Sequence, residues 1–107
     1  MSKPLNVQII TRARSLIEDK ERWCSGAVAL DARGTTVSPI SSQATKRCAL
    51  GALIASAYEI INDYGQANIL AINAVRSFQG ISTLVNINDA RGHAAVLAFF
   101  DEAIASG

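Results

Sequence analysis

The chain is long enough for one domain and too apolar to be disordered. It has 107 residues, half of them hydrophobic, and a formal net charge of +1, whereas disordered chains are poorer in apolar residues and richer in charge. Its ten basic side chains are scattered, with no stripe or tail. We therefore expect a single globular domain over residues 1–107, with no nucleic-acid partner and no attraction to a membrane surface.

We expect neither a secretory signal nor a membrane span. The N-terminus leads from Pro4 into an amphipathic pattern, not a continuous apolar run. The longest apolar stretch, Cys48 to Ala57, is well short of the roughly 20 residues that a spanning helix needs. A cytoplasmic protein is expected, in which two cysteines are most often reduced and buried.

The first predicted helix runs from Pro4 to about Asp19 or Lys20. Pro4 suits a first helical turn, because the amide hydrogen that proline lacks has no partner there in any case. Apolar side chains then recur at helical spacing. They are Leu5, Ile9, Ala13, Leu16 and Ile17. This face is expected to pack on the core.

The next segment lacks a helical period and is predicted to form a β-hairpin. Its strands are expected at residues 27–30 and 35–37, joined by a turn in which Gly34 supplies a positive φ. Pro39 closes the hairpin, because proline cannot donate a hydrogen bond to the strand ladder. Trp23, the only tryptophan, is expected to plug the end of the helical bundle.

The second predicted helix is the central one. Ser41 or Ser42 can cap its start, and Gly65 can end it in a left-handed conformation. Large apolar residues form one face and small residues a second, so contacts are expected on more than one side. The large residues are Leu50, Leu53, Ile54, Ala57 and Ile61, and the small ones are Cys48, Gly51, Ala52 and Ala55. Gly51 costs about 1 kcal/mol of helix propensity relative to alanine, which is offset if another backbone approaches closely there.

Two more helices complete the predicted fold. The third covers residues 66–78, residues 81–88 form a connector, and Asp89 caps the fourth helix. The third helix has these inward residues: Ala67, Leu70, Ala71, Ala74, Val75 and Phe78. The fourth has His93, Val96, Leu97, Phe100 and Ile104 on one face. The sequence thus predicts a mainly α, compact four-helix domain with a small β-hairpin between helices 1 and 2.

Short motifs along almost the whole chain resemble one family. In order, they are Arg22-Trp23, Gly26-Ala27, Asp31, Gly34, Cys48-Ala49-Leu50-Gly51-Ala52-Leu53, Asn88-Asp89-Ala90, Gly92-His93, and Val96-Leu97 through Phe100-Asp101. Their combination is similar to a family of small bacterial proteins, with phage-related members, that is defined only as a domain of unknown function. The resemblance implies a fold and a set of positions, but no activity.

Four residues have the chemistry for a metal site or a thiol-based catalytic site: Cys24, Cys48, Asp89 and His93. Thiolate and imidazole suit Zn²⁺, but the chain has no Cys-x-x-Cys or His-x-x-x-His pair. We therefore expect no metal and no cofactor. Cys48 would pack as a small hydrophobe and Cys24 would be a partly exposed thiol. His93 would bond to Asp89 or to a backbone carbonyl.

A catalytic alternative makes Cys48 the nucleophile, His93 its base and Asp89 the residue that orients the base. It requires the first turns of the second and fourth predicted helices to meet. A thiol at a helix N-terminus gains thiolate character. Cys48, however, is predicted to lie several residues inside its helix, where burial raises the pKa instead. Catalytic residues are accordingly not assigned.

The segment from Asn88 to His93 is the best candidate for ligand recognition. Its polar side chains, free helix amides and the Arg91 guanidinium could hold an anion, although capping by Asp89 alone also explains the pattern. Trp23 could form a contact surface. The candidate binding residues are Trp23, Arg47, Cys48, Asn88, Asp89, Arg91 and His93.

The predicted function is a small non-enzymatic protein-interaction or regulatory module, with a protein partner or a second copy as its target. Apolar residues exceed what one face per helix requires, as at Ile69, Ile72 and Phe99, and exposed apolar surface often marks a partner site. The alternative is a ligand, metal or thiol-based catalytic site around Cys48 and Asp89 with His93.

Overall fold

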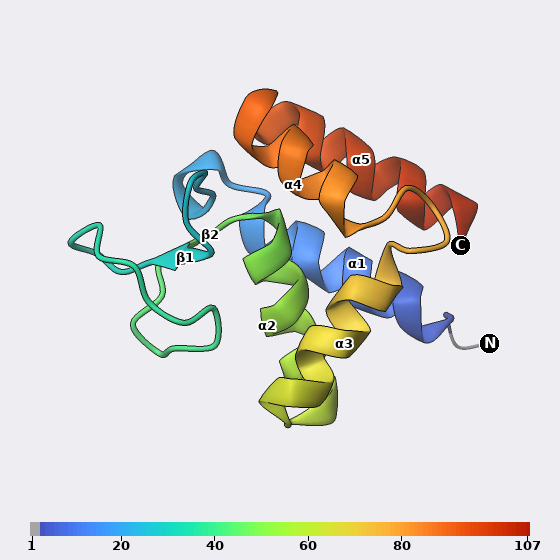
Figure 1. Ribbon diagram of the computed structural model, residues 1–107, viewed down its shortest axis with the longest axis horizontal. Helices are drawn as coiled ribbons and strands as arrows, with labels where there is room; N and C mark the ends of the chain where they lie inside the picture. Colours follow the sequence, from blue (N-terminus) through green and yellow to red (C-terminus); the bar gives the residue numbers. More distant parts are fainter. Residues whose placement is uncertain (1–2) are drawn as a thin grey trace.

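The computed structural model describes residues 3–107 of the chain. The elements are α1 (Leu5–Ile17), the 3₁₀ turn η1 (Lys20–Arg22), β1 (Ala29–Leu30), β2 (Lys46–Arg47), α2 (Ala49–Ile61), α3 (Tyr64–Ala74), α4 (Ile81–Ala90) and α5 (His93–Ser106). Figure 1 shows α4 and α5 side by side at one end, α2 and α3 at the other, and α1 between the two pairs. The predicted mainly helical fold is confirmed, and no helix within residues 3–107 is long and apolar enough to cross a membrane.

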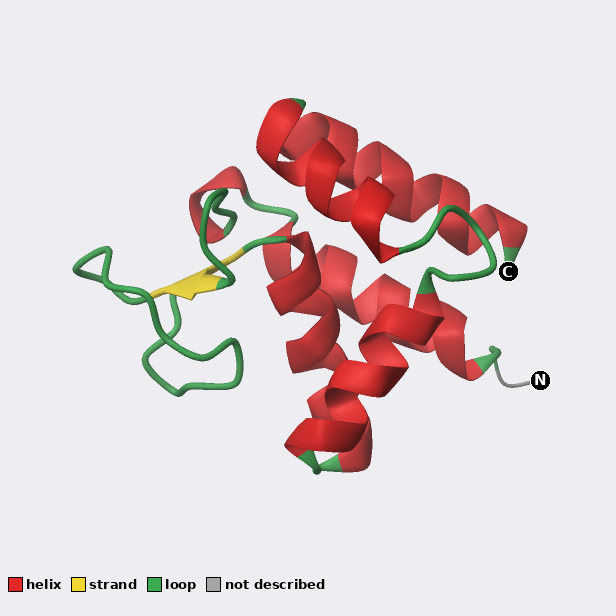
Figure 2. Ribbon diagram, viewed as in Figure 1, coloured by secondary structure: helices red, strands yellow, loops and turns green. Residues whose placement is uncertain are grey.

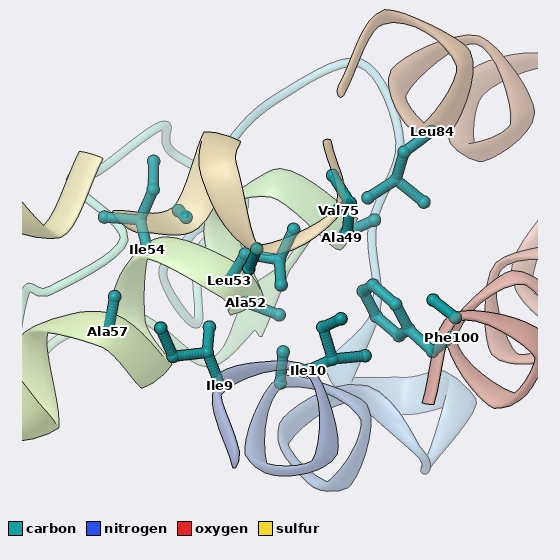
Figure 3. Close-up of a cluster of buried hydrophobic side chains, with 14 of the residues drawn as sticks. Ile9, Ile10, Ala49, Ala52, Leu53, Ile54, Ala57, Val75, Leu84 and Phe100 are labelled. Carbon is teal, nitrogen blue, oxygen red and sulfur yellow. The ribbon is translucent and has the colours of Figure 1, made fainter. Parts of the chain in front are cut away.

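The core lies between α1, α2, α3 and α5, and Leu84 of α4 adds to it. Ile9 and Ile10 of α1, Leu53 of α2 and Phe100 of α5 are almost completely buried, and Figure 3 shows their side chains converging. In α2, every residue from Ala49 to Ala57 except Leu50 is buried. The prediction that this helix is the central one is therefore confirmed.

The predicted count of four helices is wrong, because residues 81–90 form α4 instead of a connector. Leu84 and Asn88, one helical turn apart, are the buried residues of α4. The surrounding Ile, Val and Thr residues are weak helix formers, so packing of this short face decides the conformation. Asp89 consequently lies in the last turn of α4, and Gly92, at φ 92°, occupies the N-cap position of α5.

The predicted hairpin is correct in its turn and wrong in its second strand. Gly34 has φ 81°, and its N–H donates to the Asp31 carbonyl at 3.0 Å. However, residues 35–37 form only an isolated bridge to β1. The antiparallel partner of β1 is β2, with Ala29 opposite Arg47. The two strands of the small sheet are therefore farther apart in the sequence than the two predicted strands (Figure 2).

The start of α2 also differs from the prediction. Neither Ser41 nor Ser42 caps it, because the chain remains extended through β2 and Cys48 occupies the N-cap position. Ser41 instead caps a local turn, where its Oγ accepts the Gln43 N–H at 3.0 Å. Pairing of residues 45–47 with distant segments thus delays the helix by several residues.

Asn62, not Gly65, supplies the left-handed residue between α2 and α3. It has φ 53° and is the C-cap of α2, a conformation that asparagine tolerates better than most residues. Asp63 then caps α3 by accepting the Gln66 N–H at 2.9 Å. Because Asn62 ends α2 and Asp63 caps α3, Gly65 falls within α3.

Candidate functional site

Asn88 lies in α4, and its side chain bonds to the loop after α1 and to the start of α2. Its Oδ1 accepts the Trp23 indole N–H at 2.7 Å and the Ala49 N–H at 2.9 Å. Its Nδ2 donates to the Cys24 carbonyl and to Asp89 Oδ1, both at 3.2 Å. A side-chain amide has two donor hydrogens and two acceptor lone pairs, so this buried group is fully satisfied and its position is fixed by four bonds.

Trp23 lies at the edge of the core, between the loop and the α4–α5 pair. Its indole is partly buried against the core cluster and packs on the His93 ring, with ring centroids 5.6 Å apart and planes tilted by 52°. Because its N–H bonds to Asn88, both the polar and the apolar parts of Trp23 have internal partners.

His93 bonds to a backbone carbonyl, one of the two partners predicted for it. Its Nε2 lies 2.6 Å from the carbonyl oxygen of Ile17. A carbonyl can only accept, so Nε2 carries the hydrogen. This bond ties the first turn of α5 to the end of α1 and occupies Nε2 of the ring.

Cys48 is the N-cap of α2, not an interior residue of the helix. Its Sγ accepts the Gly51 N–H at 3.3 Å, and its own N–H donates to the Val28 carbonyl at 3.1 Å. Burial raises the pKa of the thiol despite the lowering effect of the backbone N–H bonds from Gly51 and Leu50. The direction predicted for the pKa is correct, and the thiol is protonated at neutral pH.

The backbone of Val28 approaches Gly51 closely, as the sequence predicted. A Cβ built on Gly51 would lie 2.2 Å from the Val28 carbonyl oxygen, closer than any real Cβ contact. The loop of residues 26–28 therefore rests directly on the first turn of α2. Only glycine leaves room for it there.

Cys24 is buried, not partly exposed as predicted, with 6% of its surface accessible. Its N–H donates to the Arg47 carbonyl at 3.1 Å, and its Sγ lies 3.5 Å from the Ala27 carbonyl oxygen. Burial, with a smaller effect from Cys48, raises the pKa of the Cys24 thiol to about 11. Pairing of this segment beside β2, which the sequence did not indicate, is the reason for the burial.

Cys48, Asn88 and Asp89 line one pocket of about 180 Å³. The other lining residues are Gly26, Ala27, Val28, Leu50 and Val85. Sequence reasoning missed the apolar part of this lining. Val85 precedes Asp89 by four residues, and that helical spacing would have placed both on one face if α4 had been recognised.

The remaining predicted residues lie elsewhere. Arg47 is half-buried, and its Nε donates to the Pro39 carbonyl at 2.7 Å; burial lowers its pKa. Arg91 is exposed and lines a different pocket from Asp89. The structure therefore brings Cys48, Asn88 and Asp89 together in one pocket, which neither Arg91 nor His93 lines.

Within residues 3–107, no group of three or more His, Cys, Asp or Glu side chains could hold a metal ion. The pocket itself contains a neutral thiol, a saturated amide and one carboxylate beside apolar side chains.

No curated protein and no solved structure matches the chain. One family model does match, over residues 1–106, and its description is "Family of unknown function (DUF6197)". Since the match covers nearly the whole chain, the protein belongs to this family of unknown function.

Proposed function

We propose that the protein is a small non-enzymatic interaction module that pairs with a second copy of itself through the outer face of α3. The observation that carries this proposal is the exposure of Ile69 and Ile72, at 53% and 44% of their surface. These residues are three apart on one helix and therefore share a face.

Exposed apolar side chains concentrate on the α2–α3 hairpin. Of the seven large hydrophobic residues that are exposed in residues 3–107, five lie between residues 60 and 72. Figure 2 shows this hairpin at the end of the molecule away from α4 and α5, so its outer side is open to a partner. Phe99, by contrast, was expected to add to the apolar excess but is buried.

Charge supports a second copy as the partner. The segment from Tyr64 to Ala74 contains no charged residue, and the whole chain has a net charge of only +1. Two such faces can approach without like-charge repulsion, and a net charge near zero promotes association. A two-fold contact between identical helices also closes on itself without leading to fibres.

The non-enzymatic part of the proposal is supported by the surroundings of Cys48. Its thiol is neutral at physiological pH because burial raises the pKa, whereas a nucleophilic cysteine needs thiolate character. His93, the only histidine, bonds to the Ile17 carbonyl and does not line the pocket that contains Cys48. We also infer a cytoplasmic location, which suits two reduced, buried thiols.

Sedimentation velocity over a range of concentrations tests the pairing. The unaltered chain should form a dimer that dissociates on dilution, and the double variant Ile69→Glu, Ile72→Glu should sediment as a monomer. Ala94→Glu adds a carboxylate at an exposed position of α5 and should leave the dimer intact.

A chain that sediments as a monomer at every concentration would overturn the self-pairing. So would equal loss of the dimer in the α3 double variant and the α5 control, because charge alone would then explain the change. Circular dichroism of each variant verifies that the helices remain folded.

A further inference from the structure

The pocket beside Cys48 combines apolar walls with a single charge. The side chains of Ala27, Val28, Leu50 and Val85 line it, and Asp89 is the only charged residue among its eight lining residues. Small-molecule sites typically have this composition, with mostly apolar walls and a few fixed polar groups that orient the ligand.

Among residues 3–107, the carboxylate of Asp89 has no cationic partner. Its Oδ1 accepts the Gly26 N–H at 3.2 Å and the Asn88 amide N–H at 3.2 Å, and both donors are neutral. The ion pairs within residues 3–107 involve Arg12 and Arg14 and do not include Asp89. The two bonds hold the carboxylate in place, and its negative charge remains available to a ligand.

The polar group beside it is already saturated. All four hydrogen-bonding positions of the Asn88 amide are occupied within the protein, and the Cys48 thiol is neutral because burial raises its pKa. Among the polar side chains of the pocket, the Asp89 carboxylate is therefore the main group left to select a polar ligand. This electrostatic pattern favours a cation and disfavours an anion.

The size of the pocket restricts the ligand further. Its volume is about 180 Å³, and an apolar cavity of about 150 Å³ is enough to hold benzene. A ligand of roughly six to nine non-hydrogen atoms therefore fits.

We propose that this pocket binds a small organic ammonium ion, with its hydrocarbon part against Leu50 and Val85 and its charged nitrogen facing Asp89. The site is distinct from the pairing face of α3, because its walls belong to the loop of residues 26–28, the first turn of α2, and α4. Either proposal can fail without the other.

Three probes of nearly the same shape test the charge requirement in the unaltered chain. Benzylammonium, benzyl alcohol and benzoate would each be titrated while the backbone amides are followed by NMR. Benzylammonium should shift the amides of Gly26, Val28 and Leu50 and bind about twofold to fivefold more tightly than benzyl alcohol, the gain expected from one ion pair at an exposed carboxylate. Benzoate should bind most weakly.

A matched pair of variants assigns the preference to one carboxylate. Asp89→Asn should abolish the preference for benzylammonium over benzyl alcohol and leave the affinity for the alcohol unchanged. Asp63→Asn removes the same charge at the start of α3, where asparagine caps a helix as well as aspartate does, and should retain the preference.

Three results would overturn the proposal: no shifts at the pocket amides with benzylammonium, equal binding of the ammonium and the alcohol, or the same loss of preference in both variants. The comparison of probes uses the unaltered chain, so it decides the matter even if Asp89→Asn destabilises the fold. Addition of salt should reduce the preference for the ammonium and leave binding of the alcohol unchanged.

Discussion

The helical core and the junction around Asn88 are held together by different interactions. We define the junction as Trp23–Leu30, Thr45–Gly51 and α4. The core depends on buried hydrocarbon from all five helices, to which the junction itself adds Ala49 and Leu84, whereas the rest of the junction depends on directed hydrogen bonds and one close backbone contact. Apolar burial is non-directional and tolerates small displacements, but a saturated amide and a backbone contact do not. Stability is therefore expected to reside mainly in the core, and the shape of the pocket mainly in the junction.

The largest effect is expected in the core. Phe100 is fully buried, and Phe100→Ala should lower the free energy of unfolding by about 3–5 kcal/mol, because it removes apolar contacts and leaves a cavity. Urea unfolding followed by circular dichroism measures the change. The variant should still unfold in one transition. A loss below about 0.5 kcal/mol, the size expected of a surface substitution, would show that the core is not where stability resides.

A smaller but more local effect is expected in the junction. Asn88→Ala leaves the Trp23 indole N–H, the Ala49 N–H and the Cys24 carbonyl without their partner. The loss should be about 2–3 kcal/mol, since unsatisfied buried groups cost about 1–3 kcal/mol each and water can enter the adjacent pocket.

Hydrogen exchange distinguishes this local effect from a global one. In Asn88→Ala the amide of Ala49 and the indole of Trp23 should lose protection, while amides in the middle of α1 should retain most of theirs. Asn86→Ala, at an exposed position of the same helix, should change neither stability nor exchange appreciably. Uniform loss of protection in Asn88→Ala would contradict the separation of core and junction.

The smallest effect appears only at alkaline pH. The pKa of Cys24 is about 11 in the folded chain against an ordinary value of 9.0, so the unfolded chain releases this proton first. Stability should be unaffected below pH 9 and should then decline until about pH 11. Unfolding midpoints across this range should fall less steeply in Cys24→Ala. Identical slopes in the two proteins would show that the thiol is not buried.

The sequence predicted those parts of the fold that depend on neighbours along the chain. The helical spacing of Leu5, Ile9 and Ala13 indicated α1, the two apolar faces of α2 indicated its central place, and Gly34 indicated a turn. Each of these signals is contained within a few residues, so a regular pattern is enough to reveal it.

The junction could not be predicted, because its interactions join segments far apart in sequence. Asn88 reaches Trp23 across 65 positions and Ala49 across 39, and no spacing rule anticipates such pairs. The same non-local pairing moved the start of α2 to Cys48. The candidate site was accordingly predicted in part: Cys48, Asn88 and Asp89 share a pocket, His93 is engaged at Ile17, and the apolar walls were missed.

The contact between Gly51 and Val28 has a consequence for the pocket as well as for the helix. The Val28 carbonyl accepts the Cys48 N–H and occupies the space that a side chain at position 51 would need, so the loop cannot move outward without losing that bond. Residues 26–28 also form one wall of the pocket. A methyl group added at position 51 would therefore displace that wall, and the width of the pocket is governed by a residue that does not line it.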